Sequence, residues 1–136
     1  MRRGEIYWTA LDPTVGSEIR KTRPALVVSN DNNNLQARTV TVLPITSNLA
    51  RIFPFEALLP AAACGIKEDS KAKADQIRTL DKSRLRKAIG FAPPEVMARA
   101  DYAMRLHLGL ESPTQPGWIH EPSPRYRAKR TVKART

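Results

Sequence analysis

Short β-forming segments precede the one helix that the sequence predicts, and this order limits the possible folds more than any other feature. The predicted strands cover residues 5–11, 25–28, 39–43, 54–59 and 70–77. Each segment is rich in β-branched or aromatic residues or alternates apolar with polar ones, and turn-forming residues separate it from the next. Strands that come first and a helix that comes last are typical of a small twisted β-barrel or another α+β domain.

The predicted helix begins at Pro93-Pro94 and ends before Gly109. Its apolar residues recur at helical spacing: Val96, Met97, Ala100, Ala103, Met104 and Leu108. Glu95 in the first turn and the glycine after the last turn are ordinary boundary signals. We expect the apolar stripe of this helix to cover the open face of the sheet. Residues 31–34 are expected to form a turn or loop, and residues 81–86 a single helical turn.

The chain is long enough for one compact domain, and its charge favours an anionic partner. It has 136 residues and a net charge of +10. Residues 1–110 carry 17 basic and 11 acidic side chains, a net +6, and residues 111–136 carry 6 and 2, a net +4. We expect one domain over residues 1–110 and a flexible, basic, proline-containing tail over 111–136. Excess positive charge favours nucleic acid first and an acidic protein second.

Several kinds of chemistry lack their usual residues in this sequence. One histidine lies in the predicted helix and the other in the tail, Cys64 is the sole cysteine, and no Walker loop or dinucleotide motif is present. An enzyme built on this chain is therefore expected to work without a metal or another cofactor. A single cysteine cannot form an internal disulfide, and no apolar run is long enough for a leader or a membrane span. We expect a cytoplasmic protein with no membrane partner.

Two strand ends carry side chains suited to phosphate. Arg23 stands between a polar loop and the apolar run 25–28, and Thr46 follows the strand 39–43. A guanidinium is charged at any working pH, and its planar fork of donors matches phosphate oxygens. RNA carries its own nucleophile, the 2′-hydroxyl. Its cleavage therefore needs alignment, a proton acceptor, stabilisation of the phosphorane and a donor to the leaving 5′-oxygen.

These residues can be given roles in such a reaction. Arg23 would stabilise the phosphorane, and Thr46 would donate a hydrogen bond to a non-bridging oxygen. Glu18 is the available base if burial in a closed cleft raises its pKa. Structural roles stay open at this point, because Arg23 could pair with a carboxylate at a sheet edge and Thr46 could simply form a turn. Trp8 is expected in the core.

The sequence also resembles the MazF/PemK family of toxins. The resemblance rests on the segments RGEIYW (3–8), DPTVGSE (12–18), TRPALVVSND (22–31), PITS (44–47), PFE (54–56) and DQIRTLDKSRL (75–85). They occur in family order and spacing from about residue 3 to residue 110. Each segment is short, and together they are highly specific.

The resemblance implies an SH3-like β-barrel with a C-terminal helix that forms a homodimer. It implies a sequence-specific, metal-independent endoribonuclease that cleaves single-stranded RNA by 2′-hydroxyl attack and leaves a 2′,3′-cyclic phosphate and a 5′-hydroxyl. The expected partner is an antitoxin, with which such toxins bind DNA. Its acidic, disordered segment would occupy the groove in place of RNA.

The resemblance also implies residue roles. The family's catalytic arginine and threonine correspond to Arg23 and Thr46, and its mobile loop corresponds to residues 12–22, which include Glu18. The expected RNA-binding residues are Gly16, Ser17, Lys21, Ser47, Arg51, Phe53, Asp75, Gln76 and Arg78.

Two other functions remain alternatives on the sequence alone. One is a toxin of the same fold that poisons DNA gyrase by binding, and the other is an RNA-binding module without catalysis. The basic tail at 111–136 departs from the family, and we expect it to attract RNA non-specifically.

Overall fold

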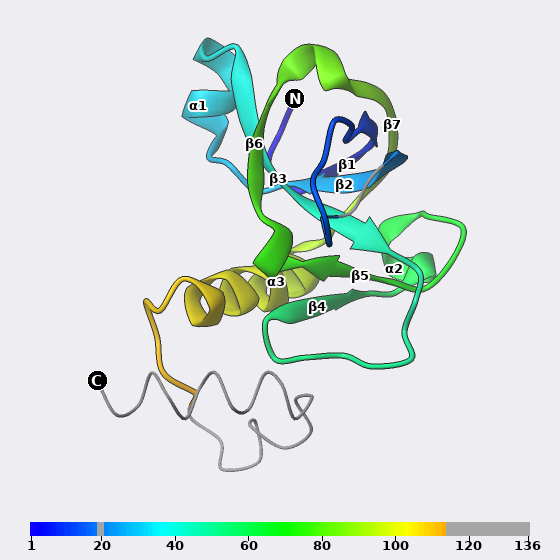
Figure 1. The fold of residues 1–136 in the computed structure, drawn as a ribbon, viewed down its shortest axis with the longest axis vertical. Coiled ribbons are helices and arrows are strands. Elements are labelled where there is room, and N and C mark those ends of the chain that lie inside the picture. Colours follow the sequence, from blue (N-terminus) through cyan, green and yellow to red (C-terminus); the bar gives the residue numbers. More distant parts are fainter. Residues whose placement is uncertain (19–20, 114–136) are drawn as a thin grey trace.

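The computed structural model describes residues 1–18 and 21–113, which form a mixed α+β domain (Figure 1). The strands are β1 (Glu5–Ala10), β2 (Thr22–Val27), β3 (Thr39–Thr46), β4 (Glu56–Leu59), β5 (Ser70–Lys73), β6 (Arg78–Asp81) and β7 (Leu85–Phe91). The helices are α1 (Asp31–Gln36), α2 (Ala61–Cys64) and α3 (Pro94–His107), and the 3₁₀ turns are η1 (Ala74–Gln76) and η2 (Lys82–Arg84).

The seven strands form one antiparallel sheet in the order β4-β5-β3-β2-β1-β7, and β6 pairs with β3. β3 is shared between two partners. Its first half, from Thr39, pairs with β6, and its last residues, Ile45 and Thr46, pair with β5. The expected α+β class with a C-terminal helix is confirmed, and the sheet is not closed.

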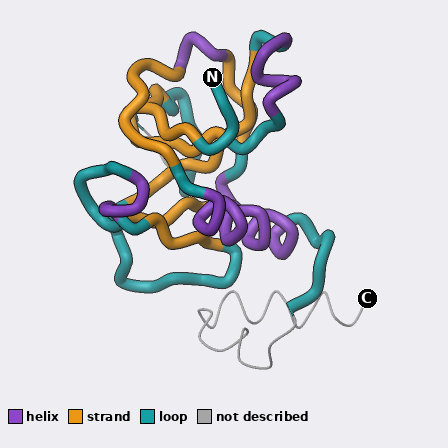
Figure 2. The backbone as a smooth tube through the Cα atoms, turned by 180° about the vertical axis from the view of Figure 1, so that it is seen from behind, coloured by secondary structure: helices purple, strands orange, loops and turns teal. Residues whose placement is uncertain are grey.

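Two apolar clusters occupy opposite faces of the central strands. Alternation along β2 sends Leu26 to one cluster and Ala25 and Val27 to the other. Four buried residues of α3 join the first cluster, namely Val96, Met97, Ala100 and Ala103. The expected packing of the helix stripe on the sheet is confirmed, and Figure 2 shows α3 lying across the strands.

The ends of α3 follow the sequence signals. Pro94 is the first helical residue, where the missing N–H removes no helical hydrogen bond. Gly109 adopts a φ of +73°, and the N–H of Leu110 donates to the carbonyl of Arg105 at 2.8 Å. This left-handed residue closes the helix one position after Leu108, as expected for glycine.

Residues 31–34 form the start of α1 and not the expected loop. The side chain of Asn30 caps the helix by accepting the N–H of Asn33 at 2.8 Å. Asn34 is buried, and its amide donates to the carbonyl of Ser29 at 2.8 Å. The asparagine-rich segment therefore supplies both the helix cap and a buried side chain that is hydrogen-bonded. The preference of asparagine for turns predicted neither role.

Two further expectations need correction in the second half of the chain. The strand predicted over 70–77 ends at Lys73, where η1 begins. The helical turn predicted over 81–86 is present as η2, but Leu85 already belongs to β7. β7 forms because it pairs with β1, a contact between distant residues that local preference does not reveal. Trp8, expected in the core, is 43 % exposed.

The expected tail over 111–136 lies almost wholly outside the described residues, which end at Pro113. Within 1–18 and 21–113, no helix has both the length and the apolar character needed to cross a membrane.

Candidate active site

The two residues assigned to catalysis lie at the ends of neighbouring strands. β2 and β3 pair antiparallel with Ala25 opposite Pro44. When the same register is extended by two residues along both strands, Arg23 lies opposite Thr46. Opposed residues in a sheet point to the same face. The guanidinium and the hydroxyl therefore emerge on one face, where the second apolar cluster ends.

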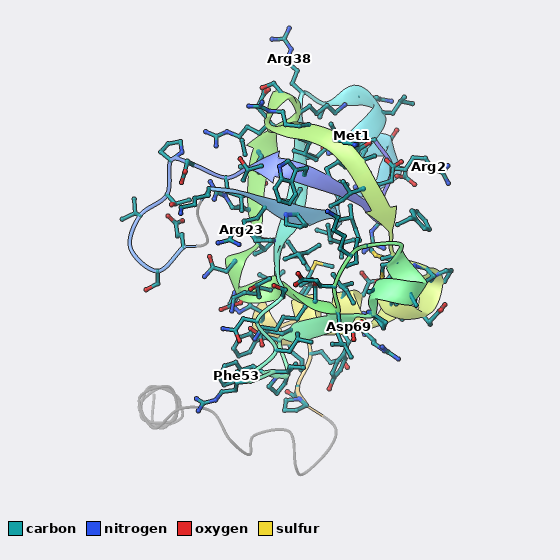
Figure 3. The ribbon with its side chains drawn as sticks, turned by 90° about the vertical axis from the view of Figure 1, so that its right-hand side faces the viewer. Met1, Arg2, Arg23, Arg38, Phe53 and Asp69 are labelled. Atoms are coloured by element: carbon teal, nitrogen blue, oxygen red, sulfur yellow. The ribbon has the colours of Figure 1, made fainter. Side chains whose placement is uncertain are left out.

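Both side chains are accessible. Arg23 is exposed and Thr46 is half-buried. The Oγ1 atom of Thr46 accepts the N–H of Asn48 at 3.2 Å, so its own proton can be donated elsewhere. Figure 3 shows Arg23 near the base of the loop that follows β1. The arrangement suits a phosphate group held between a cation and a hydroxyl donor.

The loop between β1 and β2 projects from the sheet, and hydrogen bonds fix its two ends. The N–H of Leu11 donates to the carbonyl of Lys21 at 2.9 Å, and Arg84 donates to the carbonyl of Asp12 from η2. Glu18 is exposed, and its carboxylate accepts the N–H of Val15. The burial that would suit Glu18 to act as a base is therefore not found in this structure. Gly16, Ser17 and Lys21 are exposed on the same loop.

A buried ionic cluster lies next to Thr46, and sequence reasoning missed it. Lys71 of β5 stands opposite Thr46 of β3, and Lys73 stands opposite Glu56 of β4. Glu56 accepts from the Nζ of Lys71 at 2.9 Å and from the Nζ of Lys73 at 2.8 Å. The side chain of Glu56 is fully buried, and that of Lys71 is 8 % exposed. In the sequence, residues 71–74 alternate lysine with alanine. This pattern places Lys71 and Lys73 on the same face of a strand, and it is the signal that could have pointed to the cluster.

Glu56 stays ionised in these surroundings. Burial by itself would raise the pKa of the carboxyl, but hydrogen bonds from Lys73, from the N–H of Phe53 and from Lys71 outweigh it. The pKa of Glu56 is therefore lowered from its ordinary value. The carboxylate stabilises the fold above its unfolded-state pKa, and this contribution is lost as the pH falls through the folded-state pKa.

Asp75 and Arg78, two further expected RNA-binding residues, each have a buried polar side-chain atom. Among the described residues, Oδ1 of Asp75 and Nη1 of Arg78 have no hydrogen-bond partner. The Nζ of Lys73 lies 3.8 Å from Oδ1 of Asp75. Burial raises the pKa of the Asp75 carboxyl; the charge of Lys73 opposes this rise, and the charge of Glu56 adds to it. Carboxyls with a perturbed pKa are common at functional sites, and Asp75 is therefore a candidate for proton transfer.

The segment between β3 and β4 carries the other expected RNA-binding residues. Ser47 and Arg51 are exposed, and the half-buried Phe53 stacks on Phe55 with ring centroids 5.4 Å apart. Gln76 is half-buried in η1. Residues 47–53 follow Thr46 directly, and residues 75–78 follow β5, whose Lys71 stands opposite Thr46.

The part of the chain that the structure describes contains no group of three or more His, Cys, Asp or Glu side chains placed to hold a metal ion. Cys64 is 2 % exposed, and burial raises the pKa of its thiol.

The chain is similar in sequence to two proteins that are named endoribonucleases. The chain is 46 % identical to endoribonuclease MazF9 of Mycobacterium tuberculosis over 117 residues, which covers 82 % of this chain and 99 % of the relative. It is 36 % identical to endoribonuclease EndoA of Bacillus subtilis over 111 residues, which covers 81 % of this chain and 96 % of the relative.

Solved structures show the same fold. The crystal structure of MazF from Deinococcus radiodurans matches with a TM-score of 0.70 and 33 % identity, over 80 % of this chain and 96 % of that chain. A mycobacterial endoribonuclease in complex with its cognate antitoxin matches with a TM-score of 0.67 and 27 % identity, over 83 % of this chain and 99 % of that chain.

The family described as the PemK-like, MazF-like toxin of type II toxin–antitoxin systems matches residues 2–108. This range contains every candidate site residue, and the resemblance seen in the sequence is confirmed. The chain therefore belongs to the family of PemK-like, MazF-like toxins.

Proposed function

We propose that this chain is the endoribonuclease toxin of a toxin–antitoxin pair and that it cleaves single-stranded RNA without a metal ion. The observation that carries the proposal is that Arg23 and Thr46 each lie two residues beyond the pair Ala25 and Pro44, at the adjacent ends of β2 and β3. Membership of a toxin family and the endoribonuclease names of MazF9 and EndoA support it.

The proposed reaction is an internal transfer. The ribose 2′-oxygen attacks the neighbouring phosphorus and loses its proton to a base, while the bond from phosphorus to the 5′-oxygen breaks and that oxygen takes up a proton from water. The products are a 2′,3′-cyclic phosphate and a 5′-hydroxyl. Arg23 would balance the charge that develops on the phosphorane, and Thr46 would donate to a non-bridging oxygen.

We assign the base to Asp75 in preference to Glu18. Glu18 is exposed on a loop, and its carboxylate is engaged with the N–H of Val15. Asp75 has a raised pKa, and its side chain is 28 % exposed. A raised pKa brings a carboxylate closer to the basicity that general-base catalysis needs near neutral pH.

The proposed partners follow from charge and from the relatives. We propose that the chain forms a homodimer in the cytoplasm and binds an antitoxin through an acidic segment. The net charge of +10 favours both an acidic peptide and RNA in the same groove. A mycobacterial relative is known in complex with its antitoxin.

The test is incubation of the pure protein with a long RNA in EDTA, followed by mapping of the new ends. Cuts at defined sites that bear cyclic phosphate support the proposal. Intact RNA would overturn it and favour an RNA-binding module or a gyrase-binding toxin.

Replacement of Thr46 with valine is expected to slow cleavage by roughly 10-fold to 100-fold, because one hydrogen-bond donor to the transition state is lost. Valine matches threonine in shape, so the midpoint of thermal unfolding should change little. Thr46→Ser is the matched control, since it keeps the hydroxyl and should retain most of the activity. The measurement is the single-turnover rate of RNA cleavage. Equal rates for the valine and serine variants would show that the hydroxyl of Thr46 does not contribute to catalysis.

Removal of residues 114–136 is expected to weaken RNA binding and to flatten its salt dependence. All six basic residues of the tail lie beyond Pro113, and the shortened chain keeps the ion pair between Arg105 and Glu111. The slope of log affinity against log salt should fall by up to about 4, at roughly 0.7 per phosphate contact on a single strand. Binding titrations at several salt concentrations measure this slope. An unchanged slope and affinity would show that the tail does not contact RNA.

A further inference from the structure

Two backbone groups of the segment that joins β3 to β4 are held by buried charged side chains. The Nζ of Lys71 donates to the carbonyl of Arg51. The N–H of Phe53 donates to the carboxylate of Glu56 at 2.8 Å. Lys71 and Glu56 also bind each other at 2.9 Å, so the two contacts on the segment form one connected unit.

Stability alone does not account for this pair. Lys71 and Glu56 are each 6 % exposed, and moving two such charges out of water costs about as much free energy as their attraction returns. Apolar residues of similar volume often support a fold equally well in such a place. A buried pair that also binds two backbone groups does restrict the backbone to one arrangement, which apolar side chains cannot do.

The location of the pair links it to the candidate active site. Lys71 stands directly opposite Thr46. The segment that the pair holds begins at Ser47, the next residue, and continues through Arg51 and Phe53. These are the residues expected to contact RNA on that side of the site. Figure 3 shows Phe53 below Arg23 in that view.

We propose that Lys71 and Glu56 are positioning residues that determine RNA site selectivity, because they hold residues 47–55 in one conformation next to Thr46. The inference rests on the proposed ribonuclease function. Neither residue touches the reacting atoms in this assignment. Their role is to keep the Arg51 and Phe53 side chains where they contact the nucleotides next to the cut.

The same carboxylate reaches the other side of the site. Glu56 holds Lys73 at 2.8 Å, and Lys73 lies 3.8 Å from Asp75. Glu56 therefore connects the segment 47–55 to the start of η1. A single buried carboxylate orders both groups of expected RNA-binding residues.

The test uses the double variant Lys71→Met/Glu56→Gln in the full-length protein. Replacing both residues leaves neither Lys71 nor Glu56 as an unpaired buried ion, and Lys73, which loses Glu56, still has Asp75 at 3.8 Å. Methionine and glutamine keep the volumes close to those of the replaced side chains. We expect the variant to fold, while kcat/KM at the most strongly cut sites of a long RNA falls by about tenfold or more. Misplacement of a contact by about 1 Å can cost as much as roughly 100-fold. Loss of the Glu56 charge next to Asp75 would act on strong and weak sites alike. The ratio of rates between strong and weak sites is therefore the readout, and it should fall.

Asp101→Asn is the matched control. It breaks the ion pair between Arg3 and Asp101, which joins the N-terminal segment to α3. This variant also loses a charge pair, but its pattern of cuts should remain that of the wild type. A purely structural role for Lys71 and Glu56 predicts the same unchanged pattern in the double variant, and that result at full folding would overturn the inference.

A second variant decides the question if the double variant does not fold. Arg51→Ala removes an exposed side chain and leaves the backbone carbonyl that Lys71 binds, so this variant should fold normally. It is expected to lower the same rate ratio between strong and weak sites. A wild-type ratio in Arg51→Ala would overturn the inference. Failure of the wild-type protein itself to cut RNA in EDTA would instead overturn the proposed function.

Discussion

Replacement of Arg23 with alanine is expected to lower the rate of RNA cleavage by about 10²-fold to 10³-fold, the usual effect of losing a preorganised group that stabilises transition-state charge. Arg23 is exposed, and it stands opposite Thr9 in the pairing of β2 with β1. The substitution therefore removes no core contact, and the midpoint of thermal unfolding should stay within a few degrees of that of the wild type. Single-turnover cleavage of a long RNA measures the effect.

Arg23→Lys is the matched control for this experiment. Lysine keeps the positive charge but lacks the planar fork that engages two phosphate oxygens. We expect an intermediate rate, because charge and geometry both contribute. A rate for Arg23→Ala equal to that of the wild type would exclude Arg23 from the reaction. Equal rates for lysine and arginine would show that charge alone is sufficient.

Replacement of Asp75 with asparagine is expected to lower cleavage by about 10²-fold to 10⁴-fold, the usual contribution of a general base. A base acts when it is deprotonated, so the rate should rise with pH through the pKa of Asp75. Burial raises this pKa above the ordinary value of 3.8, and the rising limb of the pH–rate profile should therefore lie above pH 3.8. Asparagine cannot titrate, so this limb should disappear in the variant.

Stability gives an independent check on the Asp75 variant. Because the folded-state pKa is raised, the folded chain binds a proton at Asp75 more tightly than the unfolded chain does. The ionised carboxylate consequently costs stability at pH values above its folded-state pKa, and this cost is relieved as the pH falls through that value. Asparagine removes the cost, so loss of activity in Asp75→Asn should not be accompanied by a lower unfolding midpoint.

Glu18→Gln distinguishes the two candidate bases. With Asp75 as the base, the Glu18→Gln variant should keep the rising limb of the pH–rate profile. Loss of the limb in Glu18→Gln and its retention in Asp75→Asn would reverse the assignment. The comparison is direct, since each substitution replaces one carboxyl by an amide of nearly the same shape.

Much of the fold could be predicted from local patterns. The strand 39–43 and the helix after Pro93 were predictable, because alternation and helical spacing reflect burial on one face of a single element. Their observed counterparts are β3 and α3. α1 was not predicted, because the four polar residues at 31–34 depend on Asn34 finding a buried partner in Ser29. β7 was not predicted, because its exposed residues Arg86 and Lys87 take up a strand only through pairing with β1.

The candidate site shows the same division. The sequence by itself determined the family and proposed Arg23 and Thr46, because the chemistry of a guanidinium and a hydroxyl at strand ends is visible in residue types. Only the tertiary structure decided that these two residues lie at the adjacent ends of paired strands. It also decided that Glu18 is exposed while Asp75 is shielded, and that Lys71 and Glu56 are buried together. The physical reason is that pKa values and ion pairing depend on which residues distant in the chain exclude water from a group, and sheet pairing sets those neighbours.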